Sequence, residues 1–125
     1  MKKLYAAAAL LAVIIAVGFA EHKAANDTAE SVLTAADRAS EAAYSESGEL
    51  EELCKNARDE WNRRKPVLEL FLPHEALDET DITAEKLVIY ADLGDRSSTL
   101  ITLSELKNRM IALRESEEVD IYNLL

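Results

Sequence analysis

The chain has 125 residues, of which 49% are apolar, and it carries 24 Asp and Glu against 14 Lys and Arg, a formal net charge of −10. This length allows one domain at most, and the apolar content is too high for a fully disordered chain. A single Cys excludes a disulfide framework. The excess of carboxylates argues against a nucleic-acid binder, which needs clustered basic residues to neutralise phosphates.

Residues 4–20 form an uncharged apolar segment that follows Lys2 and Lys3. As a helix with a rise of about 1.5 Å per residue, the segment spans roughly 25 Å, slightly less than a hydrocarbon core of about 30 Å. Two interpretations fit this length. The segment is either a retained anchor that crosses the lipid bilayer or a signal peptide cleaved after Ala20, where small residues have the spacing of a leader cleavage site.

Both interpretations place the rest of the chain outside the cytoplasm, because Lys2 and Lys3 stay inside by the positive-inside rule. From Glu21 onward, 12 basic residues remain against 24 acidic ones, a formal charge of −12. In that compartment Cys54 has no partner for an intramolecular disulfide. We expect it to be a small buried residue and not a redox centre, because reactive thiols need an exposed, electropositive setting.

A stripe of small apolar residues predicts a helix over residues 26–46. Its members recur at alternating intervals of four and three: Ala25, Ala29, Val32, Ala36, Ala39 and Ala43. Leu33 and Tyr44 are expected to widen the stripe. Because Ala buries little area per residue, this helix should depend on its neighbours for stability.

A second helix is predicted after Gly48, with Ser47 as its N-terminal cap. Its apolar residues repeat every three or four positions and should form one buried face: Leu50, Leu53, Cys54, Ala57 and Trp61. Pro66 lacks a backbone donor, so the helix is expected to kink or stop there.

Two more helical patterns follow Pro73, separated by Gly94 and Asp95. The first has a predicted buried face of Leu77, Ala84, Leu87, Val88 and Ala91, and the second of Leu100, Leu103, Leu106, Met110 and Leu113. The apolar tail residues are expected to dock on the bundle: Val119, Ile121, Leu124 and Leu125.

The β-branched runs at 87–90 and 99–102 leave one alternative open, a hairpin across residues 86–103 followed by a helix that Thr102 and Glu105 cap. We favour helix-turn-helix, because an isolated two-stranded hairpin is marginal in water. The predicted fold is therefore all-α, with an N-terminal membrane helix followed by an extracytoplasmic three- or four-helix bundle.

The order of several short motifs resembles a family of small membrane-anchored proteins of Gram-positive bacteria, domain of unknown function 4363. The motifs are Lys-Lys before an apolar run, Trp61 in a charged helix, Leu70-Phe71-x-x-His74-Glu75-x-x-Asp78, Leu-x-x-Leu-Lys at 103–107, and the closing Asn123-Leu124-Leu125. The Ala-rich first helix and Pro66 differ from the family pattern. The resemblance implies a membrane-bound helical domain outside the cytoplasm and no known reaction. On this basis we favour the retained anchor, with residues 1–22 as membrane segment and residues 23–125 as the bundle.

His74, Glu75 and Asp78 are the best candidates for a metal site, because residues four apart on a helix share a face. A zinc site needs a third ligand, and the only other His is His22, beside the membrane segment. We therefore favour a structural role for His74 near the start of the following helix, and we expect no metal and no cofactor.

The only basic cluster surrounds Trp61 and supplies the candidates for an interaction surface: Arg58, Arg63, Arg64 and Lys65. Such a patch could bind an anionic partner, with Trp61 as an aromatic anchor. We favour the alternative, in which Trp61 lies in the core and the basic residues pair with nearby carboxylates.

No complete catalytic constellation is present, so an enzyme, for instance a metal-dependent hydrolase, is the least favoured function. The sequence predicts a protein-interaction or structural module with an unknown partner in the membrane or envelope and no nucleic-acid partner. A small-ligand or cation-binding sensor is the alternative.

Overall fold

The computed structural model describes residues 1–45 and 48–124, and the side chains of these residues as far as Ser116. Within this part the chain forms four helices and no strand. The helices are α1 (Lys2–Tyr44), α2 (Leu50–Leu68), α3 (His74–Asp92) and α4 (Arg96–Leu124). The predicted all-α fold is confirmed, and its bundle has four helices.

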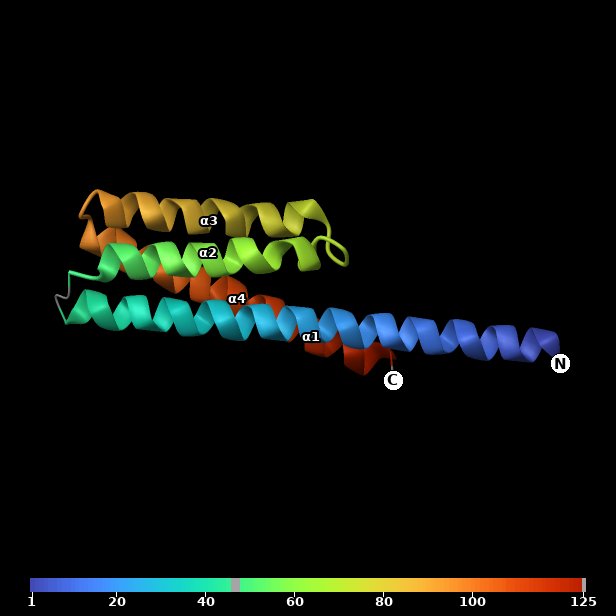
Figure 1. Cartoon of the computed structure of the whole chain (residues 1–125). Helices are drawn as coiled ribbons and strands as arrows, with labels where there is room; N and C mark the ends of the chain where they lie inside the picture. The colour runs from blue at the N-terminus through green and yellow to red at the C-terminus, as the bar shows by residue number, and fades with distance from the viewer. Residues whose placement is uncertain (46–47, 125) are drawn as a thin grey trace.

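The helices form an up-and-down bundle in which consecutive helices run antiparallel (Figure 1). Helix α1 packs against α2 and α4, and α3 packs against the same two helices from the opposite corner. The turn between α2 and α3 and the C-terminal end of α4 therefore lie at the end of the bundle from which α1 projects.

Helix α1 runs without interruption through 43 residues, across the expected boundary between residues 22 and 23. Its first half projects from the bundle (Figure 1). The large apolar side chains of this half are exposed on all sides of the helix. Among the described residues, this is the one helix that is long and apolar enough to cross a membrane. A membrane anchor and a signal sequence both meet this criterion.

The second half of α1 contributes the predicted Ala stripe to the core. All six residues of the stripe are buried. The five from Ala25 to Ala39 pack with the buried faces of the other three helices. Leu33 lies at the edge of the core, but Tyr44 is 78% exposed. The expectation that Tyr44 widens the stripe was wrong, because the position after Ala43 is rotated by about 100° away from the buried face.

Helix α2 continues past Pro66 to Leu68, so the helix does not stop at Pro66, one of the two outcomes expected there. Because Pro66 has no N–H, the carbonyl of Asn62 lacks its hydrogen-bond donor within the helix. Asn62 is exposed, so water can donate to this carbonyl instead. The next turn closes through backbone bonds that do not involve Pro66, such as the bond from Glu69 N–H to the Lys65 carbonyl at 3.0 Å. Burial of Leu68 holds this last turn against the core.

The N-terminus of α2 also differs from the prediction. Its N-cap is Glu49, which makes no side-chain capping bond, and Ser47 lies outside the described residues. The docking predicted for the tail at Val119, Ile121, Leu124 and Leu125 likewise concerns side chains beyond the described ones.

Residues 86–103 form a helix, a turn and a second helix, as favoured over the hairpin. The turn uses Gly94, whose φ of 72° suits a residue without Cβ. The capping box at Thr102 belonged to the hairpin alternative and does not form, since α4 begins at Arg96. Asp95 caps α4 by accepting a bond from the Ser98 N–H at 3.1 Å.

Buried threonines explain why a β-branched run is helical here. The hydroxyls of Thr99 and Thr102 donate to carbonyls four residues earlier, each at 2.7 Å. Their polar groups are therefore satisfied within the helix, and their methyl groups are left to pack in the core.

Candidate functional site

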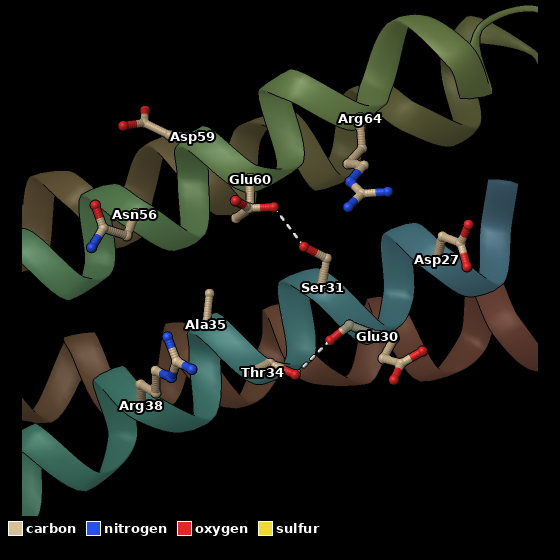
Figure 2. Close-up of a pocket in the computed structure, with 10 residues that line it drawn as sticks. All are labelled: Asp27, Glu30, Ser31, Thr34, Ala35, Arg38, Asn56, Asp59, Glu60 and Arg64. Carbon is tan, nitrogen blue, oxygen red and sulfur yellow. Dashed lines mark hydrogen bonds between the residues drawn. The ribbon is translucent and has the colours of Figure 1, made fainter.

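An open groove of about 570 Å³ lies between α1 and α2 (Figure 2). Its walls are mostly polar and charged, and α1 and α2 each supply part of them. The lining residues are Asp27, Glu30, Ser31, Thr34, Ala35, Arg38, Asn56, Asp59, Glu60 and Arg64.

One hydrogen bond ties the two walls of the groove together. The Ser31 hydroxyl on α1 donates to Glu60 Oε2 on α2 at 2.5 Å, and Arg63 donates to the other oxygen of the same carboxylate. The bond from Ser31, followed by the bond from Arg63, holds the pKa of the Glu60 carboxyl below its usual value. Glu60 is therefore ionised at neutral pH and fixed in place.

The remaining charges of the groove are mixed. Two guanidinium groups, those of Arg38 on α1 and Arg64 on α2, reach toward the space between the helices (Figure 2). Four carboxylates line the same groove, so its net charge is negative. This arrangement suits a polar protein surface better than a phosphate, which favours clustered cations.

A second polar cluster joins α2 to α3 around Asp81. The buried Trp61 ring, 1% exposed, donates its Nε1–H to Asp81 Oδ1 at 2.7 Å, and the Lys65 ammonium pairs with Asp81 Oδ2. The hydrogen bond with Asp81 raises the pKa of the Lys65 ammonium above its usual value. The prediction that Trp61 lies in the core is confirmed, but the partnership with Asp81 was not foreseen.

The four basic residues that were candidates for an interaction surface make separate contacts. Arg58 pairs with Asp59 at 3.1 Å, and Arg63 pairs with Glu60, as expected for local pairing on one helix. Lys65 pairs across to α3, and Arg64 lines the groove toward α1. They therefore take part in different contacts around α2.

A family model for a domain of unknown function, DUF4363, matches residues 20–124. The chain belongs to this family. It matches no curated protein and no solved structure. The match begins at Ala20, so the DUF4363 region coincides with the helical bundle and leaves the projecting half of α1 outside.

The His74 region of the DUF4363 domain lies at the start of α3. His74, Glu75 and Asp78 are all exposed, and the N-cap of the helix is Pro73. Within the described residues, no three His, Cys, Asp or Glu side chains come together as metal ligands. The structural role of His74 stays a prediction.

Cys54 is fully buried in the core, as the sequence predicted. Burial raises the pKa of its thiol to about 11, so the thiol stays protonated at neutral pH. A protonated and inaccessible thiol is a poor nucleophile and a poor metal ligand.

Sequence reasoning missed the groove and the Asp81 cluster for the same reason. Both depend on which helix faces which, and spacing along one helix does not show this. One partial signal existed for Asp81, because Trp61 and Lys65 are four residues apart and share a face of α2. Both are donors, so an acceptor on the neighbouring helix was to be expected.

Proposed function

We propose that this DUF4363 protein is a membrane-anchored module whose bundle lies outside the cytoplasm and binds another protein of the membrane or envelope. One observation carries the anchoring: the first half of α1 is uncharged from Leu4 to Ala20, exposed on every side, and continuous with a core helix. Monomeric soluble proteins rarely expose apolar surface of this extent, and a bilayer would remove it from water.

The orientation follows from charge. Lys2 and Lys3 precede the apolar segment and favour the cytoplasmic side, so the bundle at the other end of α1 is placed outside.

Two surfaces support a role in binding proteins. The groove between α1 and α2 presents charges of both signs. On the outer side of the bundle, Ile82 and Ile89 are exposed seven residues apart on one face of α3, and Leu93, at the C-cap four residues further on, is exposed beside them. Exposed apolar stripes with polar borders are typical of interaction sites, and we propose a binding role in place of catalysis.

The anchoring and orientation are tested with a C-terminal tag on the full chain in intact protoplasts. The account predicts that the tag pellets with membranes and is removed by external protease. A soluble tagged product that begins at Glu21 would show that the segment is a cleaved signal peptide. A membrane-bound tag that resists external protease would show that the bundle lies on the cytoplasmic side.

Partner binding is tested by site-specific photo-crosslinking in the same membranes. A crosslinker in place of Ile89 should form a defined adduct, whereas the matched exposed position Asn108 on α4 should not. Equal labelling at both positions would contradict a specific α3 interface.

The alternative, a sensor for a small ligand or cation, depends on the groove. Its volume of about 570 Å³ is in the range of small-molecule sites, but its lining is charged and open, unlike the apolar lining usual for such sites. A rise in melting temperature on addition of Ca²⁺, lost in Glu60→Gln, would favour the sensor over the interaction module.

A further inference from the structure

The turn between α2 and α3 combines an apolar sequence with an unusual position in the molecule. Val67 is 49% exposed, Leu70 is 78% exposed, and Phe71 is partly exposed. Turns at the surface of a soluble domain are usually polar, because they lie in water. Val67 and Leu68 are the last two residues of α2, and the turn follows them. Leu68 is buried in the core and Leu72 packs against it, so Val67, Leu70 and Phe71 are left at the surface.

Exposure alone does not distinguish this turn, since Leu93 in the α3–α4 turn is 73% exposed. The two turns differ in where they lie. Val67 lines a hollow together with Ala20 and Lys23 of α1, so the end of α2 is level with the end of the apolar segment. Leu93 lies at the other end of α3, about 28 Å away for a helix of 19 residues.

The apolar segment of α1 is short enough that, if it spans a bilayer, the membrane surface lies close to this turn. Residues 4–20 span roughly 25 Å as a helix, whereas the hydrocarbon core is about 30 Å thick. A span shorter than the bilayer is accommodated by local thinning and by flanking residues that enter the interface. Because α1 has no break after Ala20, anchoring through residues 4–20 would hold the near end of the bundle at that interface.

The charges near the turn are compatible with lipid headgroups. The carboxylate of Glu69, the one acid within residues 67–72, lies 3.6 Å from the Lys65 ammonium. Lys23 and Arg64 line the same hollow as Ala20, together with one carboxylate, that of Asp27, so cations outnumber acids there. With α1 anchored, this hollow would lie near the headgroup phosphates.

We propose that residues 67–72 form a second membrane contact, with Leu70 and Phe71 inserted at the boundary between headgroups and acyl chains. This inference rests on the proposed anchoring by α1. The contact would reach about 5–10 Å into the interface, the usual depth for apolar side chains of interfacial segments. Two contacts, through α1 and the turn, restrict how far the bundle can tilt on the membrane.

The test uses the full chain in phosphatidylcholine vesicles, some of whose lipids carry a spin label near the headgroup end of the acyl chain. Leu70→Cys and, as matched control, Leu93→Cys are labelled with a polarity-sensitive fluorophore. Cys54 is fully buried with a raised thiol pKa of about 11, so it competes poorly for the label. An unchanged helical spectrum confirms that each labelled protein is folded.

We expect blue-shifted emission at position 70 and loss of that emission with spin-labelled lipid, with neither effect at position 93. If the protein floats with the vesicles but the two positions behave alike, the second contact is overturned and the anchor stands. A blue shift at position 70 without quenching by lipid would mean that protein covers the turn, which also overturns the proposal. Failure of the chain to float would overturn the anchor and the turn contact together.

Discussion

The two halves of α1 share one uninterrupted helix and a high apolar content, yet only one of them belongs to the bundle. In the second half, small apolar residues recur on a single stripe, and every member of that stripe is buried. In the first half, large apolar residues surround the helix and remain exposed. The difference teaches that periodicity, and not apolar content, determines which part of a helix packs into a protein core.

The largest expected effect comes from removing the projecting first half of α1. Deletion of residues 2–20 should abolish stable membrane association, because the proposed bilayer contact of α1 is lost and a single interfacial turn is too small to anchor the chain. The core begins at Ala25, so the free energy of unfolding should stay within about 0.5 kcal/mol of that of the full chain in detergent, as for surface changes. Membrane fractionation and chemical denaturation measure the two effects. If the shortened chain is unfolded, the first half of α1 is needed for the bundle, which would contradict the separation of α1 into a projecting half and a core half.

In the bundle, the largest effect is expected from Trp61→Ala. Removing this buried ring should cost about 3 to 5 kcal/mol through lost transfer energy and the remaining cavity. The change also takes the indole donor away from Asp81. Denaturation followed by circular dichroism measures the loss. Trp61→Phe keeps an aromatic ring but has no N–H, so it should lower the free energy of unfolding by less than Trp61→Ala does. Equal losses of free energy in the two variants would contradict a stabilising role of Trp61 through packing.

A matched pair of valines sharpens the comparison within α1 itself. Val32 is fully buried and Val17 is 48% exposed on the same helix. Val32→Ala should cost about 2 kcal/mol from two buried methyl groups and a small cavity. Val17→Ala should leave the free energy of unfolding of the bundle unchanged in detergent. Similar costs at both positions would show that the first half also packs into the protein.

The smallest expected effect is on the melting temperature at low pH. The hydrogen bonds from Ser31 and Arg63 lower the pKa of Glu60, so they stabilise the bundle at pH values above the ordinary Glu value of 4.5. That stability is lost as pH falls through the lowered pKa. Glu60→Gln should therefore reduce the drop in melting temperature between neutral pH and about pH 3. Glu52→Gln, which changes charge equally on α2, serves as the control, and an equal reduction there would refute a specific role for Glu60.

Much of the bundle could be predicted from the sequence, because buried faces repeat along each helix. The stripe from Ala25 to Ala43 and the core position of Trp61 are examples. The continuation of α2 past Pro66 could not, since it depends on the burial of Leu68 against other helices.

The candidate site was less predictable. Local pairs such as Arg63 with Glu60 follow from spacing on one helix. The groove and the contact between Lys65 and Asp81 depend on which helices are neighbours, and this is decided by packing.

The central claim is that α1 passes from the membrane into the bundle as one rigid helix. Hydrogen exchange of the full chain in vesicles tests it at the junction, residues 18–26. The account predicts slow exchange throughout these amides, because each is bonded within the helix. A group of rapidly exchanging amides at residues 21–24 would reveal a hinge and contradict the claim.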